Sequence, residues 1–354
     1  MNPFILIDLP KLKENTITMA KMCHDNDITN LFAVVKVLAG DLPSVTAVSS
    51  VDEVDYIADS RIENLKRFQS LRQKKALMRL PMPSQVNQVV KYADLSLNSE
   101  ITTIRKLNAA AKKQNKIHEI ILMFDLGDLR EGIFYQDDYL EIVDKILLMD
   151  NINLKGIGTN LTCYGGVIPD QVNLDILVKI AHTIEHEFDI DLPLISGGNS
   201  STVHLFNRHQ IPKEINNLRI GEAIMLGRET AYGELIENMH DDVFTLYAEL
   251  IEIKEKPSYP IGKIGMNSFG EVPDIVDKGE MKRGILAIGK QDVHIDNIQP
   301  VDQSLEIVGG SSDHLIVDMK QSNYKIGDLV SFRLNYPGLL QLMTSKYVTK
   351  KYRQ

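Results

Sequence analysis

Cysteine is scarce in this sequence, and its scarcity excludes a fold held together by disulfide bonds. Only Cys23 and Cys163 occur among 354 residues. Small disulfide-dependent domains need several pairs. So few thiols are typical of proteins in a reducing cytosol. We therefore expect a cytoplasmic protein whose fold depends on a hydrophobic core.

Long apolar runs and an excess of positive charge are also missing. No run approaches the roughly 18 apolar residues that a membrane-spanning helix needs, and no basic segment precedes the first apolar stretch as in a signal peptide. The 39 Lys and Arg against 48 Asp and Glu give a net charge of −9, which does not favour nucleic acid or anionic lipid as a partner. His182 and His186 lack the glutamate of the HExxH zinc motif, so no metal site is predicted.

Up to about residue 235, the sequence alternates short apolar runs with amphipathic stretches. Helix-like periodicity is clear at 99–114, 138–149 and 171–188. The apolar runs, read as strands, are 31–35, 54–57, 76–80, 94–97, 119–124, 154–158, 193–195 and 217–220. Eight such units predict an α/β fold of the (β/α)8 TIM barrel type, while an open, doubly wound sheet is the alternative.

The last third of the sequence has a different pattern. Turn signals separate segments rich in β-forming residues, at 243–253, 283–288, 305–308, 315–319 and 328–334. The chain is therefore predicted to divide into a barrel at 1–234 and a C-terminal β-rich domain at 235–354. Residues 1–8 include a short apolar strand, which we expect to pair with the β domain.

Polar residues follow each predicted barrel strand, at the end where such barrels carry out chemistry. Two of these segments, SGGNSS (196–201) and RIGE (219–222), lie at the seventh and eighth strands, where barrels commonly bind phosphate. Glycines let the backbone approach an anion, and Ser200 and Ser201 supply hydroxyl and N–H donors. A helix cap with a tight turn is the alternative.

Lys36 ends the first predicted strand, directly after five apolar residues. Loss of hydration there would lower the pKa of its amine, and a neutral amine can form a Schiff base with an aldehyde. A lysine that reaches solvent or joins an ion pair is the alternative. A lysine and a phosphate-binding loop on one rim favour pyridoxal phosphate (PLP), which carries both an aldehyde and a phosphate.

These segments resemble the alanine racemase type of PLP enzyme, which is a barrel followed by a β domain. The resemblance is carried by AVVKVLAG around Lys36, DLGDLREG around Arg130, GIGTNLT around Asn160, LRIGEAIMLG around Arg219, and IGKQDV and SSDHLIVDM in the β domain. Longer strings, such as ADSRIENL and GTNLTCYGGVIP, are similar to the ornithine racemase branch of that family.

The resemblance implies an amino-acid racemase, an isomerase of amino-acid metabolism, with ornithine as the expected substrate. It implies that Lys36 holds PLP, that Arg219 faces the pyridine nitrogen, and that Arg130 holds the substrate carboxylate. It further implies cofactor contacts for Asn160, Asn199, Ser200, Ser201, Gly221, Glu222 and Tyr347, and substrate contacts for Asp128, Ser312 and Asp313. The β domain of such enzymes caps the partner's site, so the expected assembly is a homodimer with shared active sites.

The second catalytic base is where the sequence departs from the family. Racemisation needs a proton acceptor on each face of the α-carbon, one of them Lys36. The family's other base is a tyrosine, and Lys290 stands in its place. Lys290, Asp292, His314 and Cys163 are the candidates, with a buried packing role as the alternative for Cys163.

Acidic residues near the site loops favour a substrate with a terminal ammonium group. They are Asp128, Glu131, Glu229, Asp292 and Asp313, and the alternative is that they balance nearby arginines. The alternative functions are three: a racemase of alanine or of broad specificity, a non-catalytic PLP-binding homeostasis protein, and a PLP lyase or aldolase. The β domain argues against the homeostasis protein, and the lack of a metal-ligand cluster argues against the lyase.

Overall fold

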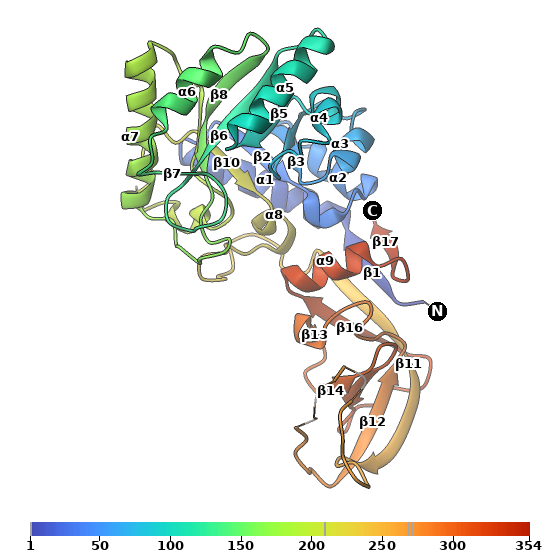
Figure 1. Ribbon diagram of the computed structural model, residues 1–354. Coiled ribbons are helices and arrows are strands. Elements are labelled where there is room, and N and C mark those ends of the chain that lie inside the picture. The colour runs from blue at the N-terminus through green and yellow to red at the C-terminus, as the bar shows by residue number, and fades with distance from the viewer. Residues whose placement is uncertain (1, 209, 268, 271, 273) are drawn as a thin grey trace. The chain divides into compact units, whose positions relative to one another are not determined.

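The computed structural model describes residues 2–208, 210–267, 269–270, 272 and 274–354. The chain divides into two compact units: residues 9–241 form one, and residues 1–8 together with 242–354 form the other. In Figure 1 the first unit runs from blue to yellow, and the second is mainly orange and red.

The first unit is a closed barrel of parallel strands. Its strands are β2 (Asn30–Val34), β3 (Val54–Asp59), β4 (Lys74–Leu77), β5 (Leu95–Asn98), β6 (His118–Asp125), β8 (Ile152–Thr159), β9 (Leu194–Ser196) and β10 (Asn217–Ile220). Consecutive strands are neighbours, and pairing of β10 with β2 closes the ring. All eight predicted strands are present, so the barrel is confirmed and the open sheet is wrong. The two-residue strand β7 (Ile133–Phe134), which pairs with β6, was not predicted.

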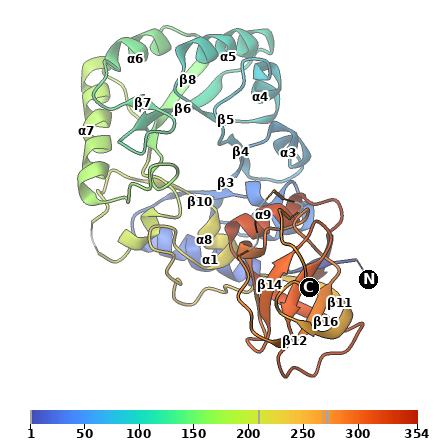
Figure 2. The same ribbon diagram turned by 60° about the horizontal axis from the view of Figure 1, so that its bottom comes forward.

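Helices lie outside the ring of strands (Figure 2). They are α1 (Leu9–Asp25), α2 (Leu42–Ser49), α3 (Ile62–Arg67), α4 (Val86–Tyr92), α5 (Ile101–Lys113), α6 (Leu140–Leu147), α7 (Gln171–Phe188) and α8 (Glu222–Leu226), with 3₁₀ turns η1 (Lys36–Leu38) and η2 (Thr202–Leu205). The start of α7 shows a local cause. Asp170 accepts the N–H of Asn173, whose side chain accepts the N–H of Asp170, and such a capping box satisfies two donors at a helix start.

Side chains on one face of each barrel strand line the barrel interior. Phe32 and Val34 of β2 point into a core shared with the other strands. Strand β2 ends at Val34, so this alternation of side chains does not extend to Lys36. Arg219 pairs with Phe32 across β10 and β2, and therefore shares the same face. Arg79 falls within the predicted strand 76–80 but lies beyond β4, which ends at Leu77.

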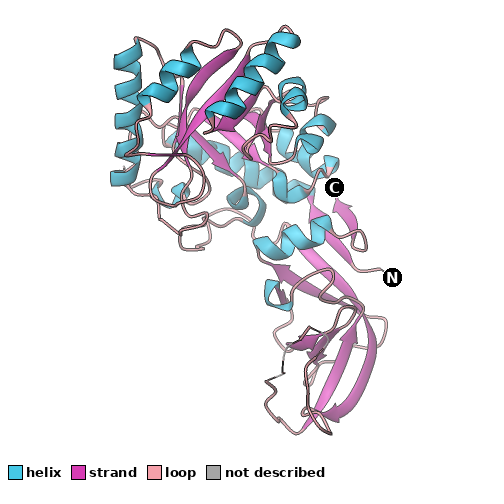
Figure 3. Ribbon diagram, in the orientation of Figure 1, coloured by secondary structure: helices cyan, strands magenta, loops and turns pink. Residues whose placement is uncertain are grey.

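The second unit is a mostly antiparallel sheet, drawn largely as strands in Figure 3. Its strands are β1 (Phe4–Asp8), β11 (Phe244–Pro257), β12 (Glu280–Leu286), β13 (Ile298–Pro300), β14 (Glu306–Gly310), β15 (Leu315–Asp318), β16 (Leu329–Leu334) and β17 (Thr349–Arg353), with 3₁₀ turn η3 (Ile295–Asn297) and helix α9 (Tyr336–Thr344). The sheet order is β13-β16-β11-β12-β15-β14. The N-terminal strand β1 pairs antiparallel with β11 and parallel with β17. The expectation of a β-rich C-terminal fold is confirmed.

None of the described helices is long and apolar enough to cross a membrane. Within the same described ranges, no group of three or more His, Cys, Asp or Glu side chains could hold a metal ion.

Candidate active site

Arg219, at the carboxyl end of β10, is a buried cation with three oxygen partners. Its side chain is 3% exposed. It donates to the Ser196 hydroxyl of β9, to the Thr159 carbonyl of β8, and to Asn160 Oδ1 at 2.6 Å. Burial lowers the pKa of Arg219 to about 10. The guanidinium therefore keeps its charge at neutral pH.

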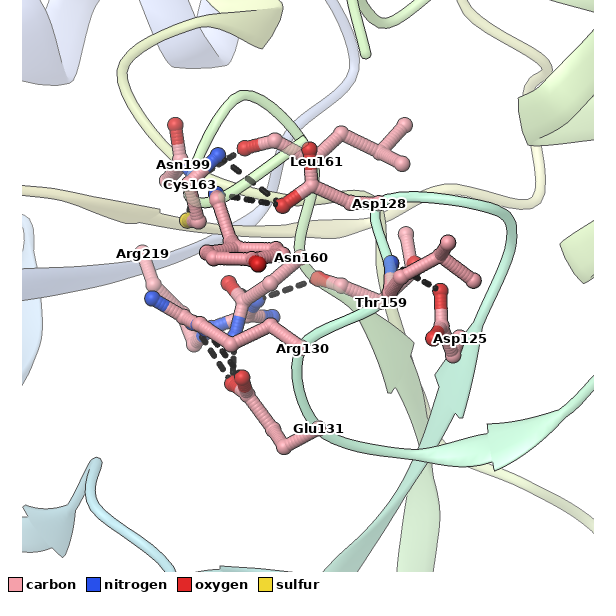
Figure 4. Close-up of polar contacts among 12 residues, drawn as sticks. Asp125, Asp128, Arg130, Glu131, Thr159, Asn160, Leu161, Cys163, Asn199 and Arg219 are labelled. Carbon is pink, nitrogen blue, oxygen red and sulfur yellow. Dashed lines mark hydrogen bonds and ion pairs between the residues drawn. The ribbon is translucent and has the colours of Figure 1, made fainter. Parts of the chain in front are cut away.

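Glu131 and Asn160 connect Arg219 to a second arginine (Figure 4). Asn160 Nδ2 donates to Glu131 Oε1 at 2.5 Å, and Arg130 Nη2 donates to the same oxygen at 2.6 Å. Arg130 Nε donates to the other oxygen of Glu131. The predicted residues Arg130, Asn160 and Arg219 thus lie together. The ion pair with Arg130 agrees with the alternative that Glu131 balances nearby arginines, whereas its contact with Asn160 was not predicted.

The loop that carries Arg130 is shaped by its own backbone. Asp125 at the end of β6 accepts the N–H groups of Gly127 and Leu129 at 2.8 and 3.1 Å. Gly132 has φ of +131°, and a Cβ there would lie 2.5 Å from the Asp125 nitrogen. Only glycine fits such a close approach. This turn returns the chain to β6 immediately after Arg130 and Glu131.

The loops after β9 and β10 are tied together by Ser200. Its hydroxyl oxygen accepts the N–H groups of Gly221 and Ala223, each at 3.2 Å. Ser201 is buried, and its hydroxyl has no hydrogen-bond partner among the residues described. Asn199 Oδ1 accepts the Ser201 N–H at 2.9 Å. The predicted phosphate-binding residues are therefore adjacent, and one buried hydroxyl among them is unsatisfied.

Lys36 follows β2 as the first residue of the turn η1, and its side chain is exposed. The expectation of a lysine buried at a strand end is wrong, because β2 stops at Val34 and Lys36 begins the turn η1. Two carboxyl groups interact with this lysine. Burial raises the pKa of Asp59 to about 6 and that of Glu222 to about 7, while the charge of Lys36 acts to lower both.

Asp128 organises the loop after β8. It is 1% exposed, and its carboxylate accepts the N–H groups of Cys163, Tyr164 and Val167 at 3.1, 2.8 and 3.0 Å. Burial acts to raise the pKa of Asp128, but these backbone donors hold it below its usual value. Its carboxylate is thus engaged within the protein, and the contact with substrate predicted for it stays a prediction.

Cys163 lies on that loop with its side chain exposed, so the alternative of a buried packing residue is wrong. Its sulfur accepts from Asn199 Nδ2 at 3.5 Å. The protein packed around it raises the pKa of the thiol, and the Arg130 guanidinium acts in the opposite direction. Because the net shift is upward, the thiol is protonated at neutral pH.

The remaining predicted residues lie in the β unit, where two of their loops meet. Lys290 N–H donates to the Ser311 carbonyl at 2.8 Å, and Gln291 N–H to the Ser312 carbonyl at 3.1 Å. Lys290 Nζ lies 4.3 Å from the centre of the Phe269 ring. Glycine at 289 permits this approach, since a Cβ there would lie 2.3 Å from the Ser312 oxygen.

The other predicted residues of the β unit are Asp292, Ser312, Asp313, His314 and Tyr347. Asp292 is 5% exposed and accepts the Ser345 hydroxyl at 2.6 Å. The Ser312 hydroxyl donates to Asp313 at 3.0 Å, and His314 N–H donates to the Ser311 hydroxyl at 3.2 Å. Tyr347 is 66% exposed. The choice of second base among Lys290, Asp292, His314 and Cys163 stays a prediction.

Comparison with known proteins gives matches over the whole chain. The alanine racemase N-terminal domain model matches residues 7–229. The chain is 50% identical to the ornithine racemase of Acetoanaerobium sticklandii over 353 residues, which is 99% of each chain. It is 37% identical to the lysine racemase of Thermotoga maritima over 358 residues, 99% of this chain and 98% of that one.

A solved structure agrees on the fold. The alanine racemase of Bartonella henselae, with covalently bound pyridoxal phosphate, is 16% identical and gives a TM-score of 0.75 over 100% of both chains. Both units of this chain are therefore those of the alanine racemase fold. With the domain match and the two full-length relatives, this chain belongs to the alanine racemase family.

Proposed function

We propose that the protein is a PLP-dependent amino-acid racemase that interconverts the L and D forms of ornithine. The observation that carries this proposal is the 50% identity to an ornithine racemase along 99% of the chain. The site agrees with it, because an exposed lysine, two arginines and a serine loop meet at one rim of the barrel. The lysine racemase relative makes L-lysine the second substrate to test.

The residues present fit PLP. The Ser201 hydroxyl is buried without a partner in the described part of the chain, and a phosphate oxygen would accept its hydrogen bond. Gly198 has φ of +121°, which lets the loop backbone close around an anion. Lys36 would hold the aldehyde carbon, Ser200, Ser201, Gly221 and Glu222 the phosphate, and Arg219 the ring nitrogen. When bound, PLP withdraws electrons from the amino acid and makes its α-proton acidic.

Each protein group then has a task set by its chemistry. Arg219 donates hydrogen bonds and does not give up a proton at neutral pH, since its pKa is about 10. Arg219 would therefore donate a hydrogen bond to the ring nitrogen of bound PLP without protonating it, which would disfavour side reactions such as transamination. Arg130 holds the substrate carboxylate through paired N–H donors. Lys36 removes and returns the α-proton on one face of the substrate.

The opposite face needs a second base, and we propose that it acts within a homodimer. Three of the four candidates, Lys290, Asp292 and His314, lie in the β unit. In this proposal the β unit of one protomer completes the barrel site of its partner. The two free cysteines support a cytoplasmic location.

The test is a chiral assay of the purified holoenzyme. L-ornithine, L-lysine and L-alanine are each incubated in deuterium oxide, and the product is analysed for handedness and α-deuterium. We expect ornithine to react fastest and to approach an equal mixture of both forms, and Lys36→Ala to abolish turnover. Faster turnover of alanine would contradict the substrate, and no α-exchange with any amino acid would contradict the racemase.

A further inference from the structure

We propose that Glu131 is a positioning residue that presents one edge of Arg130 to the substrate carboxylate and one end of the Asn160 amide to Arg219. The inference rests on the proposed function, because it assumes that Arg130 binds a carboxylate. It starts from a feature that no motif predicts: one carboxylate that joins both arginines of the rim.

An arginine can grip a carboxylate with Nε and one terminal nitrogen, or with both terminal nitrogens. Glu131 occupies Nε and Nη2 of Arg130. The edge formed by Nη1 and the second proton of Nη2 is then the one that faces a ligand. The Arg130 side chain is 41% exposed and that of Glu131 only 16%, so the glutamate is the inner partner.

The two hydrogen bonds of the Asn160 amide fix its direction. Its nitrogen donates to Glu131 at 2.5 Å, and its oxygen accepts from Arg219 at 2.6 Å. An ionised carboxylate only accepts hydrogen bonds, and a guanidinium only donates them. Glu131 and Arg219 together therefore permit only one orientation of the Asn160 amide. A neutral glutamine at position 131 would add N–H donors that face Arg130 and Asn160, and would remove this constraint.

The Glu131 carboxylate lies within electrostatic reach of both arginines, where it opposes the effect of burial on the pKa of each. Removing its charge leaves only neutral side chains between the two guanidinium groups. Their repulsion then favours movement of Arg130, which is the more exposed of the two.

The experiment compares Glu131→Gln with Glu141→Gln in the holoenzyme. Glu141 makes the same kind of ion pair, with Lys145 of α6, and both side chains are exposed, so the control removes a similar charge from a surface pair. Acetate affinity is measured by titration calorimetry as a probe of the Arg130 carboxylate site. Racemisation of L-ornithine then gives KM and kcat, and melting curves confirm folding. Both substitutions are repeated with Arg130→Lys, which cannot form the paired edge.

For Glu131→Gln we expect acetate affinity to fall and KM to rise by about tenfold, with a smaller change in kcat. In the Arg130→Lys background Glu131→Gln should change little, because the edge that it positions is gone. Equal acetate affinities in Glu131→Gln and the parent protein would overturn the inference, as would equal effects of Glu131→Gln in the two backgrounds. If acetate affinity falls as expected but no amino acid is racemised, the proposed function fails and the positioning role stands.

Discussion

Ser201 has a buried hydroxyl whose hydrogen bond no described group of the protein accepts. Such a group costs a folded protein about 1–3 kcal/mol when nothing compensates it. We expect Ser201→Ala to raise the melting temperature of the cofactor-free protein and to weaken PLP binding about tenfold. Thermal melts with and without PLP and a binding titration measure both effects.

A matched control for that substitution is Ser50→Ala, which removes an exposed hydroxyl bonded to the Ala47 carbonyl. This control should leave PLP affinity unchanged. If Ser201→Ala binds PLP as tightly as the parent protein, Ser201 is not a phosphate ligand.

His118 on β6 gives a pH-dependent prediction. It is 2% exposed and bonded to the Ser96 hydroxyl at 2.8 Å, and burial, aided by Lys116, lowers its pKa from 6.5 to about 4. As the pH falls below 6.5, the unfolded chain takes up a proton that the folded chain refuses. The free energy of unfolding is therefore highest above that pH, and it falls by about 3 kcal/mol as the pH is lowered toward 4.

Urea unfolding at about pH 7 and about pH 4.5 tests this linkage. The parent protein should lose more stability between the two pH values than His118→Asn, whose side chain does not titrate. Equal losses would mean that the folded His118 accepts its proton at an ordinary pH.

For individual residues, the sequence shows the residue type but not the contacts that its side chain makes. Lys36 stands out because it follows an apolar run, and Arg130 and Arg219 stand out because their segments resemble those of the alanine racemase family. Glu131 and Asn160 lie 29 positions apart, and no local pattern shows that their side chains meet. The same limit applies to Asp128, whose surroundings are backbone N–H groups from a distant loop.

Among the elements, the pairing of β8 with β9 depends on a glycine. Gly156 lies opposite Leu194, and a Cβ at Gly156 would be 1.8 Å from the Leu194 carbonyl oxygen. Because that atom is backbone, the strands would have to separate. We expect Gly156→Ala to lower the melting temperature severely, at a loss of about 3 kcal/mol or more.

Gly309 in β14 provides the control for Gly156→Ala. It is also a strand glycine, but a Cβ there meets no atom within 4 Å. Gly309→Ala should melt near the parent protein. Similar melting temperatures for the two variants would show that the barrel accommodates the added methyl group.

The loop at 161–167 should depend on Asp128. Asp128→Ala removes the acceptor of three backbone N–H groups, and we expect faster hydrogen exchange at Cys163, Tyr164 and Val167. The effect should fade in acid, because the pKa of this carboxyl is below its usual value and its contribution is lost as the pH falls through it. Asp175→Asn, at an exposed position of α7, is the control. Unchanged exchange at those amides would contradict the prediction.

Elements were predicted where they had a periodic apolar pattern. The bounds of α7 coincide with the predicted stretch at 171–188 because its buried residues recur three and four apart. Helix α9 was missed although Asn335 caps it and Pro337 lies in its first turn, because Asn-Tyr-Pro-Gly also signals a turn. Strand β17 was missed because TKKYR is mostly polar, and its pairing with β1 is distant in sequence.

At the scale of the molecule, β1 is the strand that joins β11 to β17. Ile5 at its centre is fully buried. We expect Ile5→Asn to raise hydrogen exchange in β11 at 244–247 and in β17, while β6 and β8 of the barrel stay protected. Leu6→Asn, on the opposite and partly exposed face, should have a smaller effect. Loss of protection throughout the barrel would show that the two units unfold together.

The order of synthesis makes β1 unusual. Phe4 pairs with Tyr247 on one side and with Thr349 on the other, so this strand leaves the ribosome before the whole barrel is made and long before either neighbour. Its apolar residues have no sheet to join during that interval. The nascent chain therefore carries an unpaired strand while the barrel folds, and this is the period in which a chaperone would be expected to bind it.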